Sequence, residues 1–190
     1  MRLYKNGIQQ IVTVDDYFPC EARSGQPIFS RAVGNELWVM LLEKAYAKLH
    51  GNYWALTGGL PHEALIDLTG KPTEHCDLKE VAKDSAFFDK MLIANQRGYL
   101  LCGETEGDII LNNNGKSETG ILPGYVYLIR EVKKSKEGNR LLEIRNPWGK
   151  GECKREDQFE PSKANYALFW MSYEDFCKHF SAVSICKNTD

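Results

Sequence analysis

The sequence predicts an α+β domain in which a helical N-terminal part packs on a mostly antiparallel sheet or half-barrel. Two observations support this prediction. Glu36–His50 repeats its apolar residues at helical spacing, whereas the second half of the chain alternates short β-rich segments with tight turns. With 190 residues, 43% of them hydrophobic and 26% charged, the chain is long enough to bury the core of one domain or of two small packed lobes.

The composition argues against several classes of partner. The formal net charge is −2, so the chain has no basic surplus of the kind that binds nucleic acid or an anionic membrane surface. No apolar run approaches the roughly 18 residues that a membrane span needs. The six cysteines, at positions 20, 76, 102, 153, 177 and 186, form no CxxC pair or metal-ligand spacing. This pattern favours a reducing, intracellular compartment.

A short strand is predicted at the N-terminus, over Ile8–Val14, where the residues are β-rich and alternate weakly. Asp15 and Asp16 end it. Paired carboxylates can bind a metal or do acid–base work, but at a strand end before Pro19 a turn is the better interpretation.

Two helices follow. Glu36–His50 has a broad apolar face that includes Leu37 and Trp38, and Gly51 suits its C-terminal cap. A histidine at this helix end is explained by the helix dipole, so His50 is a poor catalytic candidate. Pro61–Leu68 predicts a short second helix that starts with its proline.

The middle of the chain predicts one helix, one strand and a long loop. Asp84–Arg97 has helical spacing with an aspartate as N-cap, and Tyr99–Cys102 reads as a short buried strand. Glu104–Gly120 is acidic and rich in Asn and Gly, with no periodicity. Asp108 and Asn112–Asn114 could ligate a cation, but nothing at EF-hand spacing supports this, so a mobile surface loop is favoured.

The last third predicts a hairpin, two more strands and a helix between them. The hairpin joins Tyr125–Lys133 to Arg140–Asn146 through a charged turn with Gly and Asn. The other elements are a strand at Tyr166–Ser172, a helix at Tyr173–Phe180 and a strand at Val183–Lys187.

One segment, Leu141–Gly149 (LLEIRNPWG), carries the functional argument. It begins as a strand and stops at Pro147, which cannot extend a central strand and favours an extended Asn146. Asn146 therefore stands at a strand end, where an amide can orient a neighbouring group. Trp148 either covers a core or forms the wall of a cleft, and on these residues alone a strand with a capping tryptophan explains the segment better.

The hexapeptide IRNPWG resembles the asparagine motif of the calpain family of papain-like cysteine proteases, in which the Asn belongs to a Cys-His-Asn triad. Five other segments resemble the family in the same order, and together they make an unrelated α+β domain a remote alternative. They are Gly7–Cys20, Glu36–Gly51 (ELWVMLLEKAYAKLHG), Ala64–Gly70 (ALIDLTG), Phe169–Phe176 (FWMSYEDF) and Ser184–Lys187.

The resemblance implies a papain-like, calpain protease core divided into two parts. Residues 1–69 correspond to the C-terminal part of the family's first half-domain, and residues 70–190 to its second half-domain, with the change at Gly70. The segment that holds the family's nucleophilic cysteine is expected upstream of Met1. The missing first half-domain of the same protein is therefore an expected partner.

The resemblance also assigns the site residues. The family's catalytic His follows a Gly in a Gly-His-Ala-Tyr pattern, and the matching residues are Gly124-Tyr125-Val126-Tyr127. Tyr125 thus occupies the His position, with Asn146 as the retained triad residue and Gly70, Gly124 and Trp148 along the cleft. A phenol with an ordinary pKa of about 10 is neutral at pH 7 and cannot take a proton from a thiol.

The family's calcium site is expected to be degraded. Of its acidic ligands, Glu152 is the only match, and Tyr166–Leu168 stands in place of an Asp-x-Glu pattern. A hard cation needs several oxygen ligands, so no cofactor is expected.

The resulting expectation is a calpain-like domain that is inactive as it stands. It would act as a cytoplasmic binding or scaffold module for a peptide or protein partner, with the cytoskeleton as one candidate because some calpain-like proteins with substituted triads associate with it. The alternative is a fragment of a calcium-dependent calpain endopeptidase that needs its missing N-terminal half.

Overall fold

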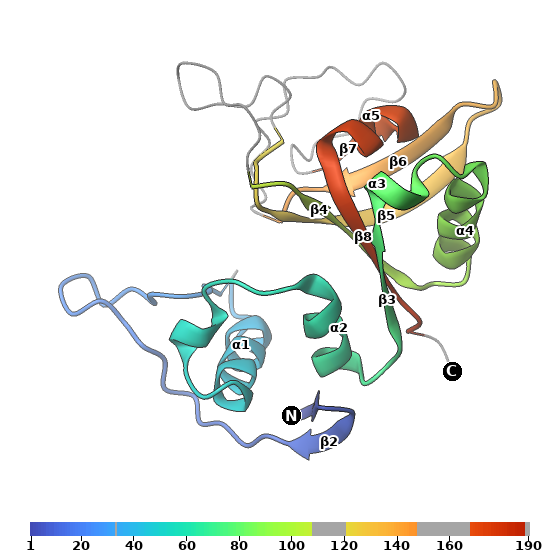
Figure 1. Ribbon diagram of the computed structural model, residues 1–190. Coiled ribbons are helices and arrows are strands. Elements are labelled where there is room, and N and C mark those ends of the chain that lie inside the picture. Colours follow the sequence, from blue (N-terminus) through green and yellow to red (C-terminus); the bar gives the residue numbers. More distant parts are fainter. Residues whose placement is uncertain (33, 108–120, 148–167, 189–190) are drawn as a thin grey trace. The chain divides into compact units, whose positions relative to one another are not determined.

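The chain forms two compact units, Met1–Gly70 and Lys71–Asp190, and each is described by itself (Figure 1). The computed structural model describes residues 1–32, 34–107, 121–147 and 168–188. The chain contains helices and a mostly antiparallel sheet, so the α+β fold class is confirmed. Among the described residues, no helix has the length and apolar character that crossing a bilayer requires.

The first unit begins with a hairpin that the sequence prediction missed. Strands β1 (Arg2–Lys5) and β2 (Ile8–Ile11) pair antiparallel. The turn between them is Asn6–Gly7, and both residues have positive φ, 51° and 76°, as a two-residue hairpin turn requires. The predicted strand over Ile8–Val14 is therefore real but ends three residues early.

Three helical segments complete the first unit: α1 (Trp38–Leu49), the 3₁₀ turn η1 (Tyr53–Leu56) and α2 (Pro61–Thr69). A small core joins the hairpin to α1 through Leu3, Val12 and Ala45. The predicted helix over Glu36–His50 is confirmed but begins two residues later, because Leu37 takes the N-cap position. Trp38, expected on the apolar face, is 60% exposed.

The second unit is built on an open six-stranded antiparallel sheet with the strand order β3-β8-β4-β5-β6-β7 (Figure 1). Its strands are β3 (Thr73–Asp77), β4 (Leu100–Thr105), β5 (Val126–Lys134), β6 (Arg140–Arg145), β7 (Leu168–Ser172) and β8 (Phe180–Cys186). The C-terminal strand β8 thus lies between β3 and β4, two strands that precede it by about eighty residues or more.

The predicted hairpin is confirmed in both its strands and its direction. β5 pairs with β6 from Leu128↔Arg145 to Lys134↔Arg140, with a bulge between Ile129 and Glu131. Two other predictions need correction at their ends. The last strand begins at Phe180 rather than at Val183, and β4 continues to Thr105, so the start of the predicted Glu104–Gly120 loop is strand.

In the described part of the second unit there are three helices: α3 (Leu78–Val81), α4 (Ser85–Gln96) and α5 (Tyr173–His179). Asp84 is the N-cap of α4 and its side chain accepts the N–H of Ala86, and the helix buries Phe87, Phe88 and Met91 in the core of the unit. Helix α5 adds Phe176, whose ring stacks on Phe180 with a centroid distance of 4.2 Å. These apolar contacts hold the sheet that presents the candidate site.

Candidate functional site

Tyr125 lies immediately before β5, and its backbone is held by the end of β4. Its N–H donates to Oγ1 of Thr105 at 2.9 Å, and its carbonyl accepts the N–H of Thr105 at 3.0 Å. Thr105 is buried, and its hydroxyl in turn has carbonyl acceptors at Leu122 (2.8 Å) and Tyr125 (3.1 Å). The Tyr125 side chain is 38% exposed, so a fixed backbone presents a phenol that solvent can reach.

Gly124 and Tyr127 fix the backbone conformation on either side of Tyr125. Gly124 has φ +69°, a conformation that favours glycine, and its N–H donates to the Glu106 carbonyl at 2.9 Å. Tyr127, which the sequence used only to align the motif, is fully buried, and its hydroxyl accepts the N–H of Leu122 at 2.8 Å. The second tyrosine of the motif is therefore an anchor for the segment that leads into the first.

Asn146 follows β6 directly and is only 6% exposed. Exposed Pro147 ends the strand there, as its missing N–H and fixed φ predict. Continuing the β5–β6 register by one residue from Leu128↔Arg145 puts Asn146 opposite Tyr127. Tyr125 lies two residues before Tyr127, at the same end of the β5–β6 pair as Asn146. The fold thus brings Tyr125 and Asn146 to one edge of one strand pair.

Of the other predicted site residues, two lie outside the described part of the chain, and Gly70 lies within it. Trp148 and Glu152 lie outside the described residues. Gly70 belongs to the first unit and caps α2, with φ +68° and its N–H donating to the Ile66 carbonyl at 2.7 Å. A Cβ on Gly70 would fall 2.4 Å from Cε1 of Tyr4, so both conformation and space require glycine there.

Three of the described cysteines, Cys76, Cys102 and Cys177, have raised pKa values that suit core thiols rather than nucleophiles. Burial raises the pKa of Cys76 and of Cys102 to about 11, with Glu74 adding to the shift at Cys76 and Glu104 at Cys102. Burial also raises the pKa of Cys177. A catalytic thiol needs the opposite shift, which a helix N-terminus or a nearby cation supplies. Cys153 lies outside the described residues.

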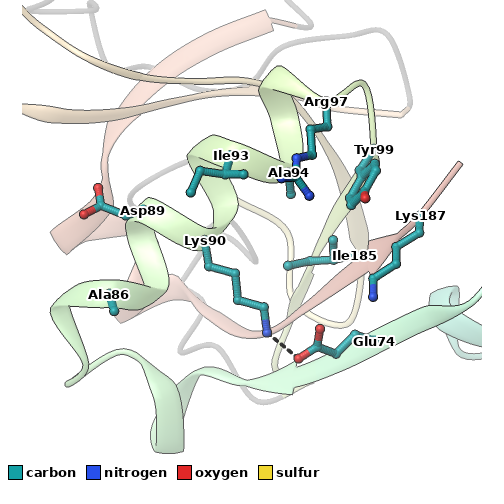
Figure 2. A pocket seen from close by; sticks show the side chains of 10 residues that line it. All are labelled: Glu74, Ala86, Asp89, Lys90, Ile93, Ala94, Arg97, Tyr99, Ile185 and Lys187. Atoms are coloured by element: carbon teal, nitrogen blue, oxygen red, sulfur yellow. Dashed lines mark hydrogen bonds and ion pairs between the residues drawn. The ribbon is translucent and has the colours of Figure 1, made fainter. Parts of the chain in front are cut away.

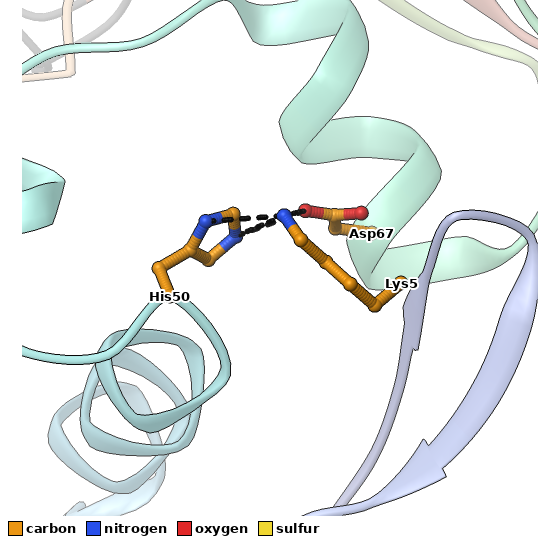
Figure 3. Close-up of polar contacts among 3 residues, drawn as sticks. All are labelled: Lys5, His50 and Asp67. Atoms are coloured by element: carbon orange, nitrogen blue, oxygen red, sulfur yellow. Dashed lines mark hydrogen bonds and ion pairs between the residues drawn. The ribbon is translucent and has the colours of Figure 1, made fainter.

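His50 belongs to a polar cluster of the first unit (Figure 3). Its Nε2 lies 2.9 Å from Oδ2 of Asp67, and its Nδ1 lies 3.2 Å from Nζ of Lys5. Lys5 Nζ also contacts Oδ2 of Asp67 at 3.4 Å. The prediction had explained His50 by the helix dipole alone and had not singled out Lys5 or Asp67. This cluster ties β1, the end of α1 and α2 together, and a structural role explains it.

Tyr46 is the fourth member of the same cluster. Its ring lies against the His50 imidazole with a centroid distance of 4.4 Å. Burial, followed by the charge of Asp67 and a hydrogen bond to it, raises the pKa of Tyr46 to about 12. The phenol therefore stays protonated through the physiological range and can donate to the carboxylate.

Comparison with known proteins agrees with these observations. Residues 1–156 match the family described as calpain family cysteine protease. The chain is 37% identical over 199 residues to the calpain-type cysteine protease DEK1 of Zea mays, with 93% of this chain and 9% of that protein covered. It is 34% identical over 207 residues to the calpain-1 catalytic subunit of Rattus norvegicus, with 99% and 28% covered.

A third relative, calpain-B of Drosophila melanogaster, is 34% identical over 200 residues, with 92% of this chain and 21% of that protein covered. The chain thus spans between 9% and 28% of the length of these curated relatives. The family match covers well over half of the chain, and it agrees with the order of motifs and with the α+β fold. The chain belongs to the calpain family of cysteine proteases.

Proposed function

We propose that this chain is the protease-core region of a calpain-type protein that binds a peptide or protein partner without cleaving it. Residues 1–69 would be the end of the first half-domain and residues 70–190 the second. The observation that carries the proposal is Tyr125 at the His position of the Gly-His-Ala-Tyr pattern, beside a retained Asn146. Its support is the anchored backbone of Tyr125 and the strand register that brings Asn146 to the same edge.

The chemistry of a Cys-His-Asn site explains why this substitution matters. The base must take a proton from the thiol and return it to the leaving group, which requires a group whose pKa lies near the working pH. Imidazole meets this requirement, and an asparagine holds its ring in the working tautomer. A phenol, with an ordinary pKa of about 10, is a proton donor at neutral pH. Asn146 beside Tyr125 can therefore keep the shape of the site while the base is lost.

A binding role uses the parts of the cleft that do not depend on the base. Gly124 has a positive φ and no side chain, so a peptide backbone can approach it closely, whereas at Gly70 the ring of Tyr4 occupies the space beside the backbone. Trp148 would supply an apolar wall. This chain covers only 9% and 28% of the length of two relatives. This supports a further partner, namely a first half-domain from the same protein, which would complete the cleft.

We place this module in the cytoplasm, with a cytoskeletal protein as one candidate partner. The described cysteines form no disulfide with one another, which agrees with a reducing compartment. Co-sedimentation of the full chain with microtubules and with actin filaments tests the candidate. Pelleting that saturates with the filament concentration supports it, whereas a chain that stays in the supernatant with both filaments argues against it.

Restoring the base tests the main proposal. An active calpain first half-domain is added to the natural chain, to Tyr125→His and to Tyr125→His/Asn146→Ala, and thiol-dependent cleavage of a fluorogenic peptide is measured. A positioned base contributes about 10²–10⁴-fold, so Tyr125→His should exceed the natural chain by at least about 10²-fold. The double variant should lose most of that gain, and a cysteine protease inhibitor should abolish it.

Two controls make the result decisive. The same first half-domain combined with an active calpain second half-domain shows that the added part is competent, and Tyr125→Phe removes the phenol oxygen while keeping the ring. The natural chain and Tyr125→Phe should be equally inactive. Equal activity of the natural chain and Tyr125→His would overturn the proposal, because the phenol or a distant histidine would then serve as base.

The second candidate function is a calcium-dependent endopeptidase that is completed by its N-terminal half. Retention of Asn146 within the IRNPWG motif favours it, as do the names of the relatives as cysteine proteases. The experiment above separates the two candidates, because only this one predicts calcium-dependent cleavage with Tyr125 in place.

A further inference from the structure

A pocket of about 490 Å³ opens in the second unit between α4, β3 and the end of β8 (Figure 2). Tyr125 and Asn146 take no part in it. A volume of this size is typical of small-molecule sites, which are mostly apolar with a few polar groups. Here the apolar lining includes Ile93, Ala94, Tyr99 and Ile185.

The sequence of α4 explains the space. Ala86 and Ala94 are small residues on the lining side of the helix, and Ile185 of β8 lies buried beneath them. Ile93 lines the same space and is 48% exposed, which is unusual for a large aliphatic side chain on a helix that packs on a sheet. The pocket therefore offers apolar surface that the described part of the fold leaves open.

Backbone hydrogen bonds cap the C-terminal end of α4. The N–H groups of Arg97, Gly98 and Tyr99 donate to the carbonyls of Ile93, Asn95 and Ala94 at 2.9–3.0 Å, and Gly98 has φ +76°. The carbonyls of Ile93, Ala94 and Asn95 are thereby satisfied and do not face the pocket as free acceptors. The same turn brings Arg97 and Tyr99 to the pocket.

Some charged residues of the pocket lining form ion pairs, and others do not. Lys90 forms an ion pair with Glu74, and Asp89 forms one with Lys134 at 2.7 Å, so both acids of the pocket are neutralised. The pKa of Glu74 is lowered mainly by its hydrogen bond to Lys90, which keeps the carboxylate ionised at neutral pH.

Two cations remain. Among the described residues, neither Arg97 nor Lys187 forms an ion pair within 4 Å, although the charge of Lys187 helps to lower the pKa of Glu74; both stand where α4 and β8 end. The backbone N–H of Lys187 donates to the Pro72 carbonyl at 3.0 Å, which fixes the chain at this end of the pocket. The lining itself carries three cations and two acids, a net charge of +1, and Lys134, which pairs with Asp89, lies outside it. Because Lys187 also acts on Glu74, Arg97 is the lining cation left to hold an anionic group, which suits a monoanion better than a dianion such as a phosphate monoester.

We propose that this pocket is a binding site for a small organic monoanion, made of one carboxylate joined to an aromatic or branched apolar body. The carboxylate binds at the Arg97 and Lys187 end, where a guanidinium can hold it in a bidentate pair. The apolar body lies against Ile93, Tyr99 and Ile185. The charge balance and the open apolar surface together select this class of ligand.

The test uses 4-phenylbutyrate as the probe and the full natural chain. Binding is followed by the amide shifts of Ile93, Tyr99 and Lys187 in a ¹⁵N-labelled sample, and the affinity is taken from their saturation. Two matched probes, 4-phenylbutan-1-ol and 4-phenylbutylamine, keep the apolar body and change only the charge. The carboxylate should bind at least about 10-fold more tightly than either, because each lacks the anion that Arg97 and Lys187 attract.

Variants separate the pocket from general charge effects. Arg97→Gln/Lys187→Gln should weaken 4-phenylbutyrate binding at least about 10-fold, whereas Lys83→Gln/Lys136→Gln removes the same charge at exposed positions outside the lining and should leave it unchanged. Ala94→Glu is avoided because that residue is buried. Unchanged far-ultraviolet circular dichroism verifies that each variant is folded.

Three results would overturn the proposal: no saturable binding of 4-phenylbutyrate, equal binding of the amine, or equal weakening in both double variants. A further arm uses a peptide that ends in phenylalanine, with a free or an amidated C-terminus. If the free-acid peptide binds at least 10-fold more tightly than 4-phenylbutyrate, the occupant is a protein chain end and the small-molecule assignment fails. The Tyr125 site takes no part in any arm, so these outcomes are independent of the catalytic proposal.

Discussion

Tyr125 and Thr105 are joined by three hydrogen-bond contacts. The Tyr125 N–H donates to the Thr105 hydroxyl at 2.9 Å, and the Tyr125 carbonyl accepts from the N–H (3.0 Å) and faces the hydroxyl (3.1 Å) of Thr105. This arrangement joins the end of β4 to the start of β5. The position that would hold a catalytic base is thus fixed by a buried residue twenty positions earlier in the chain, whatever side chain it carries.

Replacing Thr105 should loosen this position. Thr105→Val keeps the shape of the side chain but leaves the N–H of Tyr125 without its acceptor, so the free energy of unfolding should fall by about 1–3 kcal/mol. Thr105→Ser keeps the hydroxyl and should lose less. Urea denaturation of the three chains measures the difference. If Val costs no more than Ser, the hydroxyl of Thr105 does not stabilise this position and the prediction is wrong.

The Asp67 cluster should stabilise the first unit. Asp67 is 7% exposed and accepts from partners on β1 and α1, so Asp67→Ala should cost about 1–3 kcal/mol, whereas Asp16→Ala at an exposed position should cost little. Amide hydrogen exchange of the full chain can assign the loss to one unit. Protection should fall within residues 1–70 and stay unchanged in the sheet of the second unit. Equal loss in both units would contradict a local role.

Because burial raises the pKa of Cys102, the free energy of unfolding should decrease as the pH rises into the alkaline range. The pKa of Cys102 is about 11 in the folded chain and about 8.5 in an unfolded one, so the folded state favours the neutral thiol. This stabilising contribution is complete below about pH 8.5 and is lost as the pH rises toward 11. Urea midpoints of the natural chain and Cys102→Ala at pH 8 and pH 10.5 measure it. The natural chain should lose more between the two pH values, by up to about 2 kcal/mol.

Parallel losses in the two chains would show that other groups carry the alkaline dependence. Tyr46, whose pKa is raised to about 12, is one such group, and it is common to both chains. Comparing the difference between the chains removes its contribution.

Calcium should bind this chain weakly. Of the family's acidic ligands, Glu152 alone matches, and Tyr166–Leu168 offers no carboxylate where the family has two. Ca²⁺ takes six to eight oxygen ligands, so calorimetric titration of the chain should give a dissociation constant in the millimolar range or weaker. Micromolar affinity would contradict this prediction and would favour the calcium-dependent alternative.

The local elements were predictable because their signals lie in neighbouring residues. The apolar spacing of α1, the Asp84 cap of α4 and the turn between β5 and β6 each act within a few positions, and all three elements are confirmed. The hairpin of β1 and β2 was missed although Asn6–Gly7 marks it, because Arg2–Lys5 carries little alternation of its own. Helix α3, of four residues, is too short for periodicity to reveal.

The sequence by itself determined the family, the expectation of an α+β fold and the tyrosine at the His position, since each depends on the identity and order of residues along the chain. Only the tertiary structure decided that β8 lies between β3 and β4, that Asp67 meets Lys5 and His50, and that α4 leaves an apolar pocket below Arg97 and Lys187. These relationships join residues 17 to more than 100 positions apart in the chain. Such contacts follow from how the elements pack, which no local pattern encodes.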